Sequence, residues 1–208
     1  MIVNATALPS DANQRGPRDH DVRSQIIDAA NEYFRHYGYG KTTVSDLASS
    51  IGLSKAYIYK FFASKQEIGE AICRRHLLVV SQNVAAAVEE TSSAAEKIRI
   101  LFSKTLSESL SLFFTDRKVH DLCAHAALER WAPPLEYERR VADLIQKIVK
   151  EGRQAGEFER QTPLDEVTRA IFCILEPFMN ALLPQYRIDD AEKACADVVG
   201  LGLRSLAP

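Results

Sequence analysis

The sequence predicts an all-α protein with about nine helices. Apolar residues recur at three- and four-residue intervals along most of the 208 residues, which is the period of an amphipathic helix. No run alternates as a half-buried strand does, and the longest apolar run, AIFCILEPFMNALL, is too long for an ordinary strand. Proline and glycine separate the later segments, at Pro133-Pro134, Gly152, Gly156, Pro163 and Pro184.

The expected elements follow in order. Residues 1–20 lack periodicity and contain Pro, Gly, Asn and Asp, so we expect a flexible arm. A first helix is expected at 22–37, stopped by Gly38 and Gly40. Two short helices follow, and then a long helix whose start is capped by Ser64. The full set of expected later helices is 65–90, 94–114, 117–131, 134–154, 164–184 and 189–206.

The segment TTVSDLASSIGLSKAYIYKFFASK, residues 42–65, predicts two short helices joined by a tight turn. Thr42 or Thr43 can cap the first helix with its hydroxyl group. Gly52 ends that helix, because glycine adopts the left-handed backbone without steric cost, and Ser54 can cap the second helix. This is the layout of a helix-turn-helix that places one helix in the major groove of DNA.

Residue types on the second short helix suit a nucleic acid. Ile58 and Phe62 are expected in the core, which leaves Lys55, Tyr57, Tyr59 and Lys60 on the outside or at the rim. Lysine supplies charge to phosphate, and tyrosine can donate to phosphate oxygens or pack on a thymine methyl group. The alternative interpretation is a solvated helical hairpin in which both tyrosines are packing residues.

Backbone groups are expected to add to this surface. The helix N-termini at Thr43 and Ser54 offer N–H groups and a positive dipole end to phosphate. Lys65 lies just past the second helix and is expected to hold the DNA backbone on the far side. In the arm and directly after it, Arg15, Arg18 and Arg23 could reach a minor groove, and a disordered leader without a role is the alternative.

Residues 21–70 resemble the N-terminal domain of the TetR family of bacterial transcriptional regulators. The matching pieces are IIDAANEYFRHYGYGKTTV and SDLASSIGLSKAYIYKFFASKQEI, which follow the family's spacing without gaps. The resemblance implies base-edge contacts near Ala56 and Tyr57, and phosphate contacts from Thr43, Lys55, Tyr59, Lys60 and Lys65.

Two positions depart from the family's pattern. Position 61 is Phe where Tyr or His is more common, so one polar DNA contact is expected to be missing. Tyr57 is bulkier than the small or hydroxylated residue usual there, so we expect an altered operator preference. The domains expected from these observations are an arm at 1–20, a DNA-binding domain at 21–66 and an effector-binding and dimerisation domain at 67–208.

Composition fits this organisation. The chain is 46% apolar and 26% charged, as soluble globular proteins are. Its net charge of −2 argues against a general nucleic-acid coat protein, but residues 1–76 carry +2 and residues 77–208 carry −4. The four cysteines form no CxxC pair, and no signal peptide or membrane span is evident. We therefore expect reduced thiols and a location in the bacterial cytoplasm, at the nucleoid, without a membrane partner.

Two helices near the C-terminus need burial partners. Segment 164–184 is apolar almost all round, and segment 189–206 combines apolar residues with the small Gly200 and Gly202. A small domain has little room to bury both, so we expect a self-complementary homodimer interface. The resemblance implies the same arrangement, in which the last two helices form a four-helix dimer bundle. Such a dimer presents two recognition helices to one operator.

Bulky residues in the larger domain suggest a pocket for a small-molecule effector, because apolar cavities of this kind are typical ligand sites. An ordinary core is the alternative for each of them. Glu176 lies inside the most apolar helix, where an unpaired carboxylate is costly to bury, so it is expected to face a partner, water or a ligand. The candidate ligand-binding residues are Phe102, Leu106, Leu110, Phe113, Trp131, Phe172, Glu176 and Met179.

Other functions lack support in the sequence. His120, Cys123 and His125 do not share one helical face, so no tetrahedral metal set is expected. No Ser-His-Asp pattern or glycine-rich phosphate loop is present, and we expect neither a cofactor nor an enzyme. The sequence predicts a ligand-responsive transcriptional regulator, and its action as a repressor is implied by the resemblance alone. The rivals are a helical-pocket binding protein and an interaction module without specific DNA binding.

Overall fold

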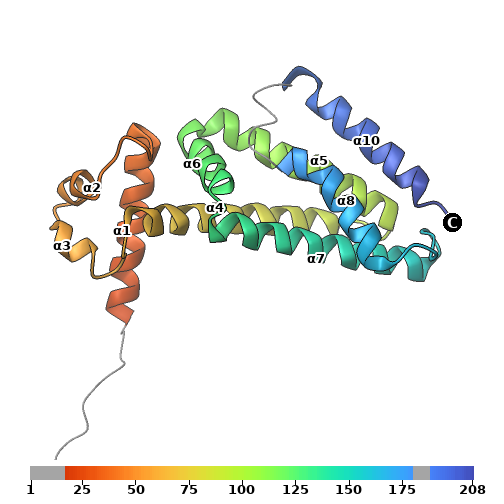
Figure 1. The fold of residues 1–208 in the computed structure, drawn as a ribbon, viewed down its shortest axis with the longest axis horizontal. Coiled ribbons are helices and arrows are strands. Elements are labelled where there is room, and N and C mark those ends of the chain that lie inside the picture. Colours follow the sequence, from red (N-terminus) through yellow and green to blue (C-terminus); the bar gives the residue numbers. More distant parts are fainter. Residues whose placement is uncertain (1–16, 180–187) are drawn as a thin grey trace, which may run out of the picture.

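The computed structural model describes residues 17–179 and 188–208. Within these residues the chain forms nine α-helices and one short 3₁₀ helix, and no strand (Figure 1). The predicted all-α class is therefore confirmed. The chain is elongated, with the three N-terminal helices at one end and the C-terminus at the other (Figure 1).

The helix boundaries lie close to those expected from the sequence. The elements are α1 (Pro17–Tyr37), α2 (Val44–Ser50), α3 (Lys55–Ile58), α4 (Lys65–Val88), α5 (Ala94–Thr115), α6 (Arg117–Leu128), α7 (Ala132–Ala155), α8 (Leu164–Met179), η1 (Ile188–Asp190) and α10 (Ala191–Ser205).

Several boundaries differ from the expectation, and α6, for example, ends at Leu128 where residue 131 was expected. Helix α1 begins at Pro17, so the last residues of the expected arm are helical, and the rest of that arm, residues 1–16, lies outside the described residues. The Pro133-Pro134 pair lies in the first turn of α7 and does not precede it, because first-turn N–H groups need no intrahelical acceptor. The expected end of the helix at 164–184 also falls outside the described residues, beyond Met179.

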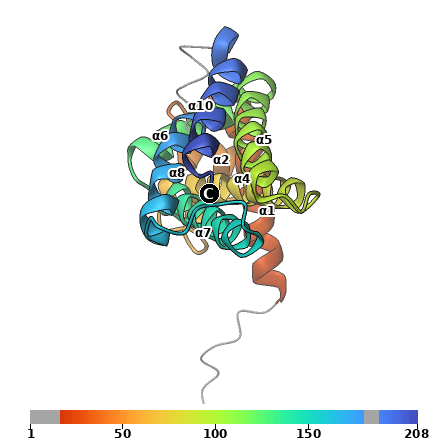
Figure 2. The same ribbon diagram turned by 90° about the vertical axis from the view of Figure 1, so that its right-hand side faces the viewer.

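Helices α4, α5, α7, α8 and α10 share one apolar core. Helix α4 packs against α5 and α7, α8 packs against α7, and α10 lies mainly along α5. Seen along the long axis in Figure 2, these helices gather into one bundle. Its fully buried members include Leu101, Phe102, Ile145, Ile148 and Leu175.

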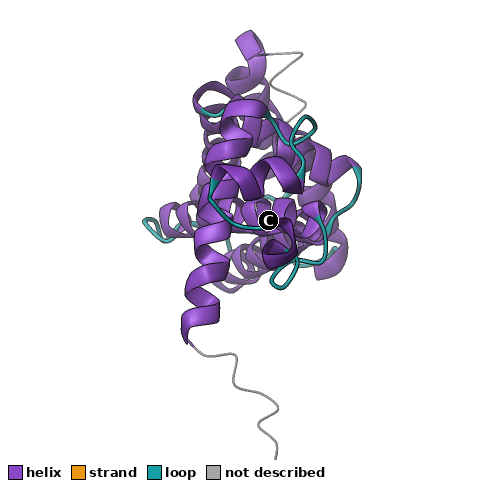
Figure 3. Cartoon of the chain, turned by 90° about the vertical axis from the view of Figure 1, so that its left-hand side faces the viewer, coloured by secondary structure: helices purple, strands orange, loops and turns teal. Residues whose placement is uncertain are grey.

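A second core joins the three N-terminal helices to α6. Helices α1, α2 and α3 and the first half of α4 close around Phe34, Ile58 and Phe62. The same cluster includes Leu122 from α6 and Trp131 from the turn before α7. Figure 3 views this end of the chain, where α1 stands beside the bundle. The N-terminal head is thus packed directly onto α6.

Two ion pairs reinforce this junction. Arg35 on α1 contacts Asp116 at the start of α6, with 2.5 Å between Nε and Oδ2. Arg75 on α4 pairs with Asp28 on α1. The preceding residue of α4, Arg74, makes a two-pronged contact with Glu136 of α7, at 3.0 and 3.1 Å. This guanidinium lowers the pKa of the Glu136 carboxyl group. Charged contacts therefore orient α1, α6 and α7 around α4.

Candidate nucleic-acid interface

Helix α2 begins with a reciprocal cap. The Asp46 backbone N–H donates to Thr43 Oγ1 at 3.1 Å, and the Thr43 backbone N–H donates to Asp46 Oδ2 at 2.9 Å. The Thr43 hydroxyl also donates to Asp46 Oδ2 at 2.7 Å. This bond, and after it the one from the Thr43 backbone N–H, lowers the pKa of the Asp46 carboxyl group, because both stabilise its charged form. The predicted cap at Thr43 is therefore present. Its side chain is exposed, at the position from which a phosphate contact is expected.

The turn, the cap and the buried side of the recognition helix form as the sequence predicts. Gly52 has φ of +67°, a left-handed conformation that side chains disfavour. Ser54 caps α3 by accepting from the Tyr57 N–H at 3.1 Å. Ile58 and Phe62 are buried, and they anchor α3 to the head's core. The buried side of this element is thus fixed.

Helix α3 is shorter than the expected helix. It ends at Ile58, and the chain continues to Phe62 through tighter turns. The N–H of Lys60 donates to the Tyr57 carbonyl and that of Phe61 to the Ile58 carbonyl, at 3.1 and 3.0 Å. Bonds of this three-residue span commonly tighten a helix end. They keep the residues after Ile58 close to the helix axis.

The outer side of α3 and of the turn that follows it presents most of the predicted DNA-contacting residues to solvent. Lys55, Ala56, Tyr59 and Lys60 are exposed, and Tyr57 is half-buried. Among the described residues, neither lysine has a carboxylate partner. Instead, Lys60 Nζ lies 5.4 Å from the Tyr57 ring and Lys55 Nζ lies 5.8 Å from the Tyr59 ring. The element therefore carries two uncompensated positive charges beside two phenol rings.

Lys65 has a different environment from the one expected. It is the first residue of α4, and its ammonium group donates to the carbonyl oxygens of Tyr39 and Thr42, both at 3.1 Å. Two of its three N–H groups are therefore used inside the head. Its contact with phosphate stays a prediction, and the structure adds a tie between α4 and the turn that follows α1.

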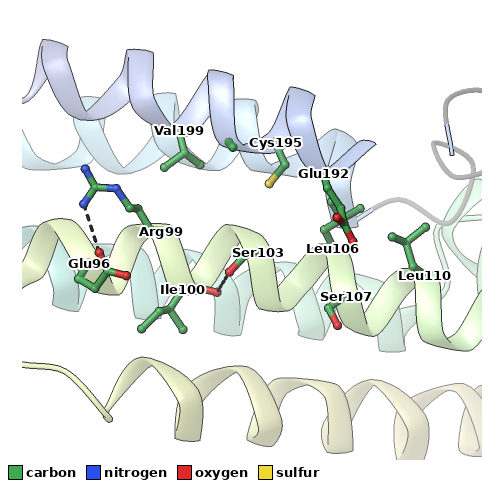
Figure 4. A pocket seen from close by; sticks show the side chains of 11 residues that line it. Glu96, Arg99, Ile100, Ser103, Leu106, Ser107, Leu110, Glu192, Cys195 and Val199 are labelled. Carbon is green, nitrogen blue, oxygen red and sulfur yellow. Dashed lines mark hydrogen bonds and ion pairs between the residues drawn. The ribbon is translucent and has the colours of Figure 1, made fainter. Parts of the chain in front are cut away.

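One hollow in the bundle lies between α5 and α10. It has a volume of about 370 Å³. Leu106 and Leu110, both predicted ligand-binding residues, line it from α5, and Cys195 and Val199 face them from α10 (Figure 4). At one end, Arg99 donates to Glu96 at 3.3 Å (Figure 4). The α10 residues were not among the predicted ligand-binding residues, although Cys195 and Val199 are spaced four apart on one face of the helix.

The other predicted ligand-binding residues do not converge on this hollow. Phe102 is buried in the core, with its ring centre 6.2 Å from that of Phe178, and Phe172 is half-buried beside that core. Trp131 belongs to the head's core, and Phe113 packs against His120, with ring centres 5.0 Å apart. Phe102 and Phe172 therefore belong to the bundle's core and Trp131 to the head's core, and Phe113 is in neither cluster.

Glu176 and Met179 line a separate, small pocket. Its volume is about 90 Å³, and Leu77, Cys123 and Tyr137 complete its wall. The Glu176 side chain is exposed, so the burial cost expected from its apolar neighbours does not arise. Its helix is amphipathic rather than buried all round, because the side of α8 that carries Glu176 is open in this subunit.

Two further features bear on function. No helix among residues 17–179 and 188–208 combines the length and apolar character needed to cross a membrane. His120 is fully buried, and no group of three or more His, Cys, Asp or Glu side chains within those residues is arranged to hold a metal ion.

A capped helix-turn-helix joined through a long helix to a helical bundle defines a DNA-binding transcriptional regulator. The family model described as bacterial regulatory proteins of the tetR family matches residues 26–72. The model described as a tetracyclin repressor-like C-terminal domain matches residues 94–199, about half of the chain. The chain therefore belongs to the TetR family of bacterial regulatory proteins.

Known proteins of similar sequence are regulators. The fatty acid metabolism regulator protein of Bacillus subtilis is 26% identical over 155 residues, covering 71% of this chain and 76% of that protein. The transcriptional repressor AcnR of Corynebacterium diphtheriae is 24% identical over 190 residues, covering 89% and 93%. These matches support a DNA-binding regulator over a pocket protein or an interaction module without specific DNA binding.

A solved structure shares the fold. The transcriptional regulator FadR from Bacillus subtilis, in complex with stearoyl-CoA, aligns with a TM-score of 0.60. The alignment covers 88% of this chain and 98% of that chain, at 22% identity. At this identity the comparison establishes the common architecture of head and bundle.

Proposed function

We propose that the protein is a homodimeric repressor that binds a near-palindromic operator in the bacterial cytoplasm and is released by an apolar effector. The main observation behind the proposed DNA-binding surface is the exposed pair Lys55 and Lys60, which lack carboxylate partners among the described residues. Lys55 begins α3, which Ser54 caps, and Lys60 lies in the turn that follows α3. Lysines of this kind neutralise phosphates. In this proposal Ala56 and Tyr57 contact base edges, and Tyr59 and Thr43 contact phosphates.

The proposed domain division places the DNA-binding part at 21–66 and the effector and dimer part at 67–208. For the dimer, α8 and α10 supply the surface. Leu201 and Ile174 are exposed on these two helices, and an open hollow of about 470 Å³ lies between them. A second copy related by a two-fold axis would cover the same residues on both subunits. It would also present two heads to one side of the duplex.

For the effector, we propose the hollow between α5 and α10. Its apolar floor, formed by Leu106, Leu110, Cys195 and Val199, suits a hydrocarbon group. The relatives named for fatty acid metabolism and for a stearoyl-CoA complex support a long-chain acyl thioester as the first compound to test. The pocket beside Glu176 is too small for such a chain without rearrangement.

A physical link joins this hollow to the head. Leu110 lines the hollow near the end of α5, and Asp116 directly follows that helix. Asp116 caps α6 by accepting from the Val119 N–H at 3.2 Å, and it also pairs with Arg35 of α1. An effector that binds two positions of α5 unequally would therefore shift the head, since release requires such a difference in affinity.

The DNA-binding proposal is tested by selecting genomic fragments that bind the full-length protein and measuring affinity for them against salt. Each phosphate contact contributes about −0.9 to the slope of log K against log salt concentration. Lys60→Ala should reduce the magnitude of this negative slope by about 2 per dimer, because each of the two heads loses one phosphate contact. Lys150→Ala, an exposed lysine on α7, is the matched control. Binding that is weak, non-specific and unaffected by Lys60→Ala would overturn the proposal.

The effector proposal is tested by titrating stearoyl-CoA into the protein–DNA complex. Release should be saturable, and Leu110→Glu should weaken it while DNA binding in the absence of ligand is retained. Leu128→Glu changes an exposed leucine of α6, away from the hollow, and should leave release unchanged. Equal loss in both variants, or release by stearoyl-CoA of a Leu110→Glu complex as readily as of the original, would place the effector elsewhere.

A further inference from the structure

Another cleft lies between the head and α6. It is separate from the DNA-contacting helix and from the hollow between α5 and α10. It has a volume of about 360 Å³, within the range of small-molecule sites. One wall is the turn that follows α1, residues 37–41, and the other is a single face of α6. That face carries Lys118, Asp121, Leu122 and His125, spaced as helical neighbours.

The cleft has positive charge that no described side chain neutralises. Lys41 and Lys118 are both exposed, and neither has a carboxylate partner among the described residues. The one carboxylate that lines the cleft, Asp121, already accepts from Arg117 Nε at 3.0 Å. The stem of Lys118 lies across Gly38, with Cδ 3.6 Å from the position of the absent Cβ. The cleft therefore offers two ammonium groups to an anion.

Aromatic rings form the rest of the wall. Tyr37 is half exposed, and Tyr39 and His125 lie with their ring centres 5.7 Å apart. The Tyr39 ring also contacts Trp131, at 5.6 Å between centres, so it is held in position from behind. Flat rings of this kind stack on flat ligands. Leu122, which is buried, adds an apolar floor.

We propose that this cleft binds a small aromatic carboxylate. The carboxylate would pair with Lys41 and Lys118, while the ring would stack against Tyr39 and His125. Such a ligand touches the head and α6 at once, so it binds best to one arrangement of the two. By thermodynamic linkage, the bound ligand then changes the protein's affinity for the operator by the same factor by which the operator changes the protein's affinity for the ligand. The effect on operator affinity rests on the proposed DNA-binding function, whereas binding of the aromatic carboxylate does not.

Ligand binding in the cleft can be followed by the intrinsic fluorescence of a nearby tryptophan. Trp131 is the single tryptophan, and its ring centre lies 5.3 Å from that of His125 and 5.6 Å from that of Tyr39. Benzoate is titrated into the full-length protein without DNA, at constant ionic strength, while Trp131 fluorescence is recorded. Benzyl alcohol supplies the ring without the charge, and acetate supplies the charge without the ring. We expect a saturable change with benzoate and a much weaker response to the other two.

Matched lysine variants locate the site. Lys118→Ala should weaken benzoate binding by about tenfold, the effect of losing one charge-assisted contact, and Lys41→Ala should act similarly. Lys150→Ala removes an exposed lysine of α7 and should have no effect. Both cleft variants change exposed side chains, so their thermal unfolding should match that of the original protein.

Several outcomes would overturn the proposal. They are the absence of a saturable signal, equal responses to benzoate and benzyl alcohol, equal responses to benzoate and acetate, and equal weakening by Lys150→Ala and Lys118→Ala. A mobility-shift assay with benzoate then tests the coupling to DNA. If benzoate binds but operator affinity is unchanged, the site stands and the coupling fails. If no operator is found at all, the proposed function fails while the fluorescence result is unaffected.

Discussion

The ammonium group of Lys65 lies 4.2 Å from the centre of the Tyr39 ring and donates to the Tyr39 carbonyl oxygen at 3.1 Å. It also donates to the Thr42 carbonyl oxygen. One side chain at the start of α4 therefore holds the whole turn between α1 and α2. Lys65, which was expected to contact DNA, therefore stabilises the structure of the head.

Replacing Lys65 by Met should destabilise the protein. Two carbonyl oxygens would lose their donor and the Tyr39 ring would lose its cation, so we expect the free energy of unfolding to fall by about 1–3 kcal/mol. Urea denaturation measures this change. Lys60→Met, at an exposed position of the recognition element, should stay within about 0.5 kcal/mol of the original protein. Equal stability of the two variants would contradict the role assigned to Lys65.

Replacing Leu201 by Glu should separate the proposed dimer. Leu201 is 64% exposed in one subunit, on the face of α10 that borders α8. A carboxylate there would be desolvated on both sides of a two-fold interface, which is costly. Sedimentation velocity should then show a monomer. Leu128 on α6 is 67% exposed, so Leu128→Glu tests surface charge alone and should leave the dimer intact. A dimeric Leu201→Glu variant would exclude this face.

Replacing Gly152 by Ala should destabilise the bundle. A Cβ at this position of α7 would lie 2.3 Å from Phe158 Cδ2 and 2.8 Å from Ala94 Cβ. Overpacking of this kind costs about 1–3 kcal/mol, which exceeds the gain of at most about 1 kcal/mol in helix propensity. Thermal and urea unfolding would measure the loss.

Gly200 is the matched control for that substitution. Within the single chain an added methyl group would meet only the flexible end of Arg204, at 3.6 Å, so both glycine variants are compared in the Leu201→Glu background, which removes the proposed contact of α10 with a second copy. Gly200→Ala should therefore be neutral or stabilising by up to about 1 kcal/mol. A stabilised Gly152→Ala variant would mean that Phe158 can move aside.

Stability should decrease as the pH falls below neutrality, in part because of His76. Burial in α4 lowers the pKa of His76, although Glu108 and Asp116 oppose the shift. The unfolded chain then takes up the proton at a higher pH than the folded chain does. The stability that depends on a neutral His76 is therefore fully present above the usual pKa of 6.5. It is lost as the pH falls toward the lower pKa that His76 has in the folded state.

Urea denaturation at a series of pH values between about 7 and 5, the range in which histidine titrates, tests this assignment. His76→Gln should flatten the dependence, because glutamine has no proton to gain. His36→Gln changes an exposed histidine of α1 and is the control. An unchanged pH dependence in His76→Gln would show that other groups dominate.

Local signals in the sequence predicted most of the fold. Thr43, Ser54 and Ser64 cap the helices that they were expected to cap, because capping depends on residues only three apart. The spacing of Ile58 and Phe62 correctly placed both in the core. The shortening of α3 was not predicted, since tighter turns and a continued helix have the same apolar spacing.

The candidate pocket was less predictable, because it depends on contacts between distant segments. Trp131 and Phe102 are similar in hydrophobicity, yet they lie in different cores. Lys65 reaches a carbonyl 26 residues away, which no local pattern encodes. Glu176 follows an apolar run, yet its side of α8 is exposed in the single subunit. Hydrophobic spacing identifies a face, but the partner of that face is set by the tertiary arrangement.

The core shared by the head and α6 has a consequence for how regulators of this kind diversify. Leu122, Ala126 and Trp131 close the same cluster as Phe34 and Ile72. A recombination event or chimera with its breakpoint after residue 66 would join a foreign head to these side chains and leave them mismatched. New operator specificity is therefore more readily acquired by point changes on α3, or by exchanging the head together with α6, than by grafting the first 66 residues alone.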